Sequence, residues 1–165
     1  MTKQLRIAFG DAIGAAYTRR FAAGGYPIEI ARRDSDKSAD IVSKIEAASV
    51  RAIAYDADAR DENSMPHLCK AVERDLGPIY VCLSNASPNY RAPRLKTTAE
   101  MFEKVCRPGC LGEFLTGRAA AKYMVPRGCG SILFTGATAS MRGGANFAAF
   151  AATESRLRGC SVDGT

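Results

Sequence analysis

Residues 131–159 read SILFTGATASMRGGANFAAFAATESRLRG and contain the clearest succession of patterns in the chain. The short apolar run at 131–135 predicts a β-strand. A glycine-rich loop follows it, and the alanine-rich stretch at 147–157 predicts an α-helix. The segment therefore indicates a strand, a loop and a helix in direct succession, which is the repeating unit of α/β proteins.

The same alternation extends outward to the rest of the chain. Strands are predicted at 5–9, 27–31, 50–55, 79–83 and 131–135, and helices at 13–23, 38–48, 64–76, 98–124 with an interruption at 107–109, and 147–157. Ile13, Tyr17 and Phe21 share one face of the first helix. This order predicts a three-layer, doubly wound α/β fold with a parallel sheet, in a single domain over residues 1–165. The pattern alone leaves other α/β folds open, flavodoxin-like ones included.

Composition limits the function classes. The chain has 165 residues, 47% of them hydrophobic, which is enough for one domain with a core. Its net charge of +6 permits an anionic ligand. The basic residues form no stripe interleaved with aromatic ones, so no nucleic-acid partner is predicted. No apolar run is long enough for a membrane span and no signal-peptide pattern is present, so we expect no membrane partner and a cytoplasmic location.

Cysteine and histidine chemistry is not supported. The six cysteines form no C-x-x-C pair, and His67 is the single histidine. We therefore expect reduced thiols and no metal site. A Ser-His or Cys-His nucleophile also has no support in the sequence.

Four short segments follow the predicted strands in an informative order. The first is FGDAIG at 9–14, where glycine allows a phosphate to approach the backbone at a helix N-terminus. Arg32-Arg33 then ends the second predicted strand, and Asp56-Ala57 follows the third. The fourth strand is followed by SNAS at 84–87. Each segment alone is compatible with an ordinary turn or surface pair.

Together with residues 131–159, these segments resemble the short-chain dehydrogenase/reductase family over residues 5–159. The resemblance implies an NAD(P)-binding Rossmann fold and a dinucleotide ligand, NADP(H) or NAD(H). The Arg pair resembles that of members that prefer NADP(H). The implied cofactor-binding residues are Gly10, Asp11, Ala12, Ile13, Gly14, Arg32, Arg33, Asp56, Ala57, Asn85, Ala86 and Ser87.

The first loop departs from the family's G-x-x-x-G-x-G. If Gly10 is the first glycine and Gly14 the third, the loop is two residues short and Ala12 takes the middle place. Without a gap, Ala8 replaces the first glycine. Asp11 also brings a negative charge to a position where phosphate charge is expected.

The family's catalytic residues are all replaced. The resemblance implies a Tyr that transfers a proton, a Lys that lowers the pKa of that Tyr, a Ser that polarises the substrate and an Asn that anchors a water. These positions map to Phe150, Glu154, Ala137 and Gly109, in the same order. Phenylalanine has no titratable group, and Glu154 reverses the charge of the Lys. No catalytic residue is therefore intact.

The family continues beyond the matched region with further strands and substrate-binding helices. The resemblance thus implies a C-terminally incomplete fold and an uncovered edge beside the fifth strand or its neighbours. We therefore expect either marginal stability or stability gained through self-association. The resemblance also implies a homodimer through the helices at 98–125 and 147–158. Three hypotheses remain open: an NADP(H)-binding domain with little or no redox activity, a non-catalytic interaction module, and a degenerate truncated product.

Overall fold

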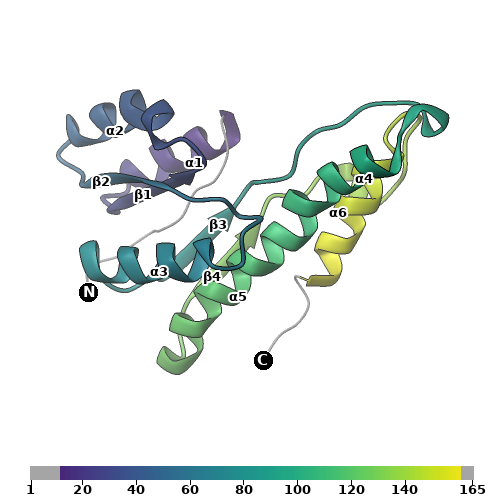
Figure 1. Ribbon diagram of the computed structural model, residues 1–165. Coiled ribbons are helices and arrows are strands. Elements are labelled where there is room, and N and C mark those ends of the chain that lie inside the picture. The colour runs from purple at the N-terminus through teal and green to yellow at the C-terminus, as the bar shows by residue number, and fades with distance from the viewer. Residues whose placement is uncertain (1–11, 161–165) are drawn as a thin grey trace.

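Strands and helices alternate along residues 12–160, which are the residues that the computed structural model describes (Figure 1). The strands are β1 (Ile28–Arg32), β2 (Ala52–Asp56), β3 (Val81–Ser84) and β4 (Ser131–Phe134). The helices are α1 (Ala12–Ala22), α2 (Ala39–Glu46), α3 (Ser64–Asp75), α4 (Ala99–Cys106), α5 (Glu113–Met124) and α6 (Ala148–Cys160). The first predicted strand, at 5–9, lies outside the described residues.

The described strands form two parallel pairs. β1 pairs with β2 from Ile28↔Ala52 to Arg32↔Asp56, and β3 pairs with β4 from Val81↔Ser131 to Ser84↔Phe134. Parallel neighbours need a crossover connection, which α2 supplies for the first pair and α4 with α5 for the second. The predicted doubly wound α/β fold is confirmed.

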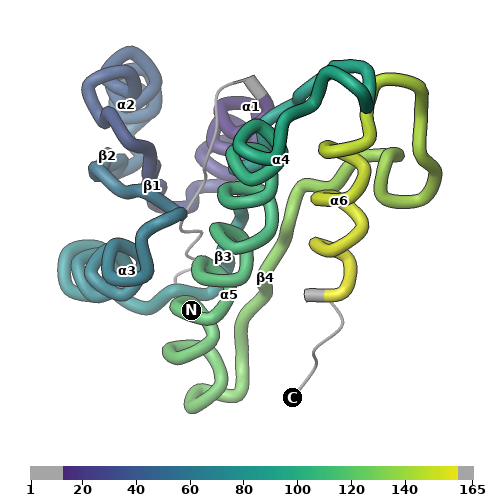
Figure 2. Tube along the Cα trace, turned by 45° about the vertical axis from the view of Figure 1, so that its right-hand side comes forward, coloured from purple at the N-terminus to yellow at the C-terminus, as the bar shows by residue number. Residues whose placement is uncertain are grey.

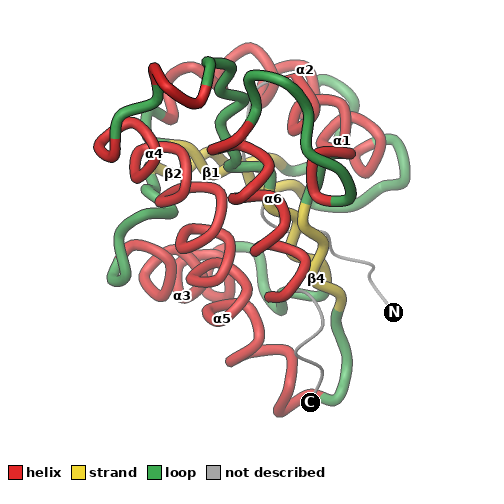
Figure 3. Tube along the Cα trace, turned by 90° about the vertical axis from the view of Figure 1, so that its right-hand side faces the viewer, coloured by secondary structure: helices red, strands yellow, loops and turns green. Residues whose placement is uncertain are grey.

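The helices cover the strands from two sides, as Figure 3 shows with α1 and α2 above the strands and α3 and α5 below them. Successive side chains of a strand point to opposite faces, so β1 contributes to two cores. Ile28 and Ile30 pack with Ala22 of α1 and Ile45 of α2. Ala31 belongs to the other core. Three layers result, with β1 buried on both faces.

The larger core lies between the strands and helices α3 and α5. Its buried members are Ala31, Ala57, Ala59, Met65, Leu68, Cys69, Val72, Ile79, Cys82, Leu115, Ala119, Ala120 and Met124. The buried face of α5 includes Gly117, Ala119 and Ala120, whose small size lets that helix approach β3 and β4 closely. Packing of this kind holds the carboxyl ends of the strands at fixed positions.

The predicted interruption of the long helix is present as a π turn. Thr98 caps α4, where its hydroxyl accepts a hydrogen bond from the backbone N–H of Met101 at 3.2 Å. The wider turn at Arg107–Gly112 then separates α4 from α5. Pro108 has no N–H to donate to the preceding turn of the helix, which favours this widening. Figure 2 shows α6 beside α4 and this turn, in agreement with the contacts between them.

Apolar side chains are exposed on both β4 and α1. β4 has a described neighbour on one side only, and its Leu133 is 45% exposed. On α1, Ile13 is 50% exposed and Tyr17 is 37% exposed. The apolar face predicted for this helix is therefore largely open, and the buried side carries Thr18, whose hydroxyl donates to the carbonyl of Gly14 at 2.7 Å. No helix within residues 12–160 is long and apolar enough to cross a membrane.

Candidate functional site

A cavity of about 710 Å³ opens beyond the carboxyl ends of β1, β2 and β3. Its described lining residues are Arg32, Arg33, Asp34, Lys37, Ala57, Asp58, Ala59, Arg60, Asn85, Ala86, Ser87, Pro88, Lys104 and Pro108. Most of them follow directly on a strand, because parallel strands end at the same edge of a sheet. In open α/β sheets this edge is where ligands bind.

The lining carries more positive than negative side chains. Five of these side chains are cationic and two are carboxylates. Lys37 forms an ion pair with Asp34 at 2.9 Å, and Lys104 pairs with Glu100 of its own helix at 2.6 Å. Arg33 is exposed and forms neither a hydrogen bond nor an ion pair with any described residue. Its guanidinium is therefore available to an anionic group.

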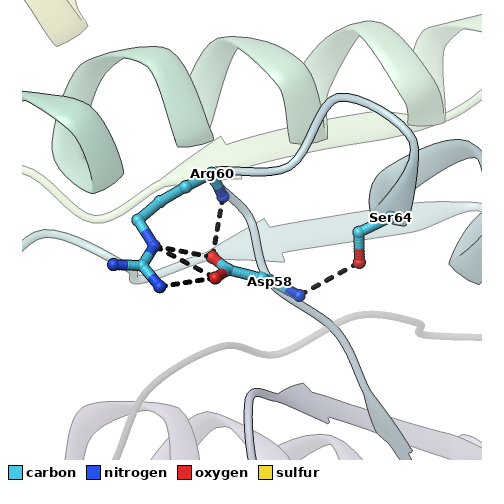
Figure 4. Close-up of polar contacts among 3 residues, drawn as sticks. All are labelled: Asp58, Arg60 and Ser64. Atoms are coloured by element: carbon cyan, nitrogen blue, oxygen red, sulfur yellow. Dashed lines mark hydrogen bonds and ion pairs between the residues drawn. The ribbon is translucent and has the colours of Figure 1, made fainter.

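A tight turn after β2 shapes one wall of the cavity. Figure 4 shows Asp58 between Arg60 and Ser64. The Asp58 carboxylate accepts hydrogen bonds from the Arg60 backbone N–H at 3.0 Å and from its guanidinium at 2.5 to 3.1 Å. The Asp58 backbone N–H donates to the Ser64 hydroxyl at 3.0 Å. Hydrogen bonding from Arg60 lowers the pKa of Asp58, so this carboxylate is charged and the turn is held at both ends.

This turn changes the interpretation of the Asp-Ala pair after β2. Ala57 lines the cavity, but Asp56 is not among the described lining residues. The Asp56 carboxylate instead accepts a hydrogen bond from the backbone N–H of Ser35 at 2.8 Å. Asp58 was not predicted from the sequence, although an aspartate that accepts a hydrogen bond from the backbone N–H two residues on is typical of a turn.

The residues after β3 contribute backbone and side-chain groups. Asn85, Ala86 and Ser87 all line the cavity. The Ala86 backbone N–H donates to the Glu113 carboxylate at 3.0 Å. The Ser87 hydroxyl donates to the Glu154 carboxylate at 2.6 Å. The segment predicted from SNAS is thus tied to α5 and to α6.

The first loop is only partly described. Gly10 and Asp11 lie outside the described residues. Ala12, Ile13 and Gly14 form the first turn of α1, and neither Ile13 nor Gly14 is among the described cavity residues. Their assignment to a cofactor stays a prediction.

The four positions that replace the family's catalytic residues lie in three segments. Gly109 is buried in the π turn, and Ala137 precedes the short 3₁₀ turn at Thr138–Ser140. Phe150 and Glu154 both lie on α6. The structure brings Ala137 and Glu154 into direct contact, because the Ala137 backbone N–H donates to the Glu154 carboxylate at 2.8 Å.

Glu154 is a buried carboxylate, with 1% of its surface exposed. Its two oxygens accept one hydrogen bond each, from Ser87 and from Ala137. Charge-assisted hydrogen bonds of this kind are the strong ones in proteins. Glu154 therefore joins the loop after β3, the loop after β4 and α6, a structural role that the charge reversal alone did not predict.

Gly109 fits this arrangement because it has no side chain. A Cβ atom at this position would lie 2.7 Å from the Ser87 hydroxyl oxygen and 2.6 Å from a methyl carbon of Thr153. Both separations are shorter than real contacts, so a larger residue would displace Ser87 or Thr153. The glycine at the family's Asn position and the serine in the SNAS segment are thus sterically matched.

Glu113 is a second buried carboxyl group at the strand ends. It is fully buried at the start of α5, and one of its oxygens has no well-formed hydrogen bond in the described part of the chain. Burial raises the pKa of Glu113 to about 7, and the negative charge of Glu154 adds to the rise. Hydrogen bonding from the Ser84 side chain and, to a smaller extent, from the Ala86 backbone N–H opposes the rise in pKa only in part. Glu113 was not predicted as a site residue, although a glutamate on an otherwise apolar helix face indicates a buried carboxyl group.

Comparison with known proteins gives a consistent picture. A family model described as short chain dehydrogenase matches residues 7–161. A short-chain dehydrogenase from Rhodopseudomonas palustris has a similar solved structure, with a TM-score of 0.89 and 39% sequence identity. That match covers 96% of this chain and 76% of the other.

More distant relatives extend the comparison. The 2,3-dihydro-2,3-dihydroxybenzoate dehydrogenase of Bacillus subtilis is 28% identical over 90% of this chain and 59% of its own length. An alcohol dehydrogenase from Thermococcus sibiricus, solved in complex with 5-hydroxy-NADP, has a TM-score of 0.89 at 22% identity, over 95% of this chain and 62% of the other. The chain spans between 47% and 59% of the length of the first curated relatives that it matches.

Proposed function

Because this chain belongs to the short chain dehydrogenase family, we propose that it is an NADP(H)-binding domain with little or no redox activity of the family's usual kind. The observation that carries the proposal is the cation-lined cavity at the strand ends, with the exposed guanidinium of Arg33 at its rim. The Thermococcus relative, which was solved with 5-hydroxy-NADP, supports a ligand of this class.

The residues present fit the adenosine end of such a ligand. Arginine recognises phosphate through two parallel hydrogen bonds, and an arginine after the second strand of this fold accommodates a 2′-phosphate. Lys37 adds positive charge to the same side of the cavity. Ala57 and Ala59 present small side chains where a flat ring needs space. We assign the 2′-phosphate to Arg33 rather than Arg32, since the Arg32 guanidinium donates to the backbone carbonyl of Lys37 at 3.2 Å.

The residues at the other end do not fit proton transfer. NADPH supplies a hydride when it is bound, and carbonyl reduction also requires a proton donor at the substrate oxygen. The side chains of Gly109, Ala137 and Phe150 have no proton to give. Glu154 already accepts two hydrogen bonds. Losing a single such donor typically costs about a hundredfold or more in rate, so we expect no measurable turnover.

Binding and activity can be tested separately. NADPH binding to the wild-type protein is measured by isothermal titration calorimetry, and NADPH oxidation is then measured with a panel of small ketones. We expect saturable binding without turnover. Arg33→Ala should weaken NADPH binding about tenfold or more, because a charge-assisted phosphate contact is lost. Arg20→Ala removes an exposed arginine on α1 and is the matched control. Equal binding by both variants would contradict the role of Arg33.

A second candidate function is that of an interaction module. Leu111 is 41% exposed and Phe114 is 45% exposed, and both line a second cavity of about 810 Å³ beside α5. Apolar side chains gathered on a surface indicate a contact with another protein, here a second copy through α4, α5 and α6. Sedimentation velocity over a concentration series tests this candidate, and a monomer at all concentrations would exclude the homodimer. A melt without cooperativity would instead favour the degenerate product.

A further inference from the structure

We propose that the cleft binds a 2′-phosphorylated adenosine nucleotide through its adenosine half alone, because Ser87, Glu154 and Ala137 close the other half of the crevice. This inference rests on the proposed function, and it restricts the part of the ligand that contacts the protein to the adenosine half. Binding through the adenosine half alone distinguishes this chain from a dinucleotide-binding domain, in which both halves of the ligand contribute to binding.

The topology divides the crevice into two halves. A doubly wound sheet of this type consists of two mononucleotide-binding units, and a dinucleotide lies across the point where the strand order reverses. β1 and β2 belong to the first unit, and β3 and β4 begin the second. The second nucleotide of a dinucleotide therefore belongs outside the carboxyl ends of β3 and β4.

Protein groups bridge the two strand ends at that position. Ser87 lies in the loop after β3, and its hydroxyl donates a hydrogen bond to one carboxylate oxygen of Glu154 at 2.6 Å. Ala137 lies in the loop after β4, and its backbone N–H donates a hydrogen bond to the other carboxylate oxygen of Glu154 at 2.8 Å. A ligand that entered between the two strand ends would have to break both hydrogen bonds and leave a buried carboxylate without partners, which is strongly unfavourable.

Ser87 and Thr153 pack closely against Gly109, behind the hydrogen bonds of Glu154. Ser87 lies against Gly109, where even a Cβ atom would come within 2.7 Å of its hydroxyl oxygen. Thr153 occupies the other side of Gly109 and is itself fully buried. Its hydroxyl donates to the Ala149 carbonyl at 3.0 Å, so it is anchored within α6.

The lining of the cavity agrees with this division. Arg33 and Lys37 line the cavity beyond the carboxyl end of β1. Toward β4 of the second unit, the last described lining residues are Ser87, Pro88 and Pro108. None of Ala137, Phe150 and Glu154 is among the described lining residues. Four of the five lining cations, Arg32, Arg33, Lys37 and Arg60, end or follow β1 or β2, together with the carboxylates of Asp34 and Asp58. The Glu154 carboxylate beyond β3 and β4 repels a phosphate.

Calorimetric titration with 2′,5′-ADP and with NADP⁺ tests the proposal. We expect dissociation constants that agree within about threefold, because the nicotinamide half adds no net contact. NADP⁺ binding about tenfold tighter, or NADP⁺ binding without 2′,5′-ADP binding, would overturn the half-site while leaving the proposed function intact. Binding of neither ligand by folded protein would overturn both.

Saturation-transfer NMR on the NADP⁺ complex gives an independent readout. We expect saturation of the adenine H2 and H8 protons and none of the nicotinamide protons. Equal saturation of both rings would overturn the proposal.

A variant tests the closing network itself. Ser87→Gly combined with Glu154→Ala removes both side chains of the network, and we expect it to favour NADP⁺ over 2′,5′-ADP by about tenfold relative to wild type. Glu46→Gln changes an exposed glutamate on α2 and is the control. A folded double variant with an unchanged ratio would overturn the proposal. If the double variant does not fold, the wild-type titration and the NMR experiment decide.

Discussion

Replacing Glu113 by glutamine should stabilise the protein at alkaline pH and leave it nearly unchanged at acidic pH. Glu113 is fully buried, and its pKa in the folded protein is raised from 4.5 to about 7, chiefly by burial. The folded state therefore holds a proton that the unfolded chain releases near pH 4.5. Stability is unaffected by this group below the unfolded pKa, falls as the pH rises from 4.5, and reaches its full loss above about 7.

The magnitude follows from the difference between the two pKa values. One pKa unit corresponds to about 1.4 kcal/mol, so a rise from 4.5 to about 7 costs roughly 3 kcal/mol once the pH exceeds both values. Glutamine has nearly the same shape and no charge, and its carbonyl oxygen can still accept the hydrogen bond from the Ala86 backbone N–H. Glu113→Gln should therefore unfold with a free energy about 3 kcal/mol higher than wild type at about pH 8, and within about 1 kcal/mol of it at about pH 4.

Urea denaturation at these two pH values, followed by far-ultraviolet circular dichroism, measures the difference. The chain has no tryptophan, so tyrosine fluorescence is the second probe. Glu46→Gln removes an exposed carboxylate and controls for the change in net charge. A Glu113→Gln variant that is no more stable than wild type at alkaline pH would refute the reasoning, because the buried group would then carry no ionisation penalty.

Three further changes test the packing around the strand ends. Gly109→Asn should lower the free energy of unfolding by about 2 kcal/mol through overpacking, and adding Ser87→Gly should recover part of this loss in thermal melts. A Gly109→Asn variant as stable as wild type would contradict the close contact between Gly109 and Ser87. Glu154→Lys should cost about 3 kcal/mol or more in urea denaturation, because it removes two hydrogen bonds and buries a cation beside a backbone N–H; a neutral effect would show that the network contributes little. Leu133→Ser should change the free energy of unfolding by less than about 0.5 kcal/mol in urea denaturation, since the side chain is 45% exposed; a large loss of stability would mean that Leu133 is covered in solution.

Most of the fold could be predicted because it depends on local periodicity. Ile28 and Ile30 alternate with residues of the opposite face, and α3 ends just before Gly77 and Pro78, as their backbone preferences require. Pro108 correctly marked the interruption of the long helix. Its form as a π turn over Arg107–Gly112 was not predicted, because helix widening depends on packing against α6 as well as on the missing N–H.

The candidate site was harder to predict because its contacts join distant parts of the chain. Ser87 and Glu154 are 67 positions apart, and Ala86 and Glu113 are 27 apart. A sequence shows that Glu154 reverses a charge, but only the tertiary arrangement shows which donors it meets. Asp58 was not predicted although its turn is local, and the assignment of Asp56 to the cofactor stays a prediction.

The most direct test of the proposed function is a calorimetric comparison of NADPH and NADH with the wild-type chain, with a thermal melt to establish cooperative folding. NADPH and NADH differ only by the 2′-phosphate that we assign to Arg33. The account predicts that NADPH binds saturably and about tenfold or more tightly than NADH. Equal affinity for the two, or no binding by a cooperatively folded protein, would contradict it.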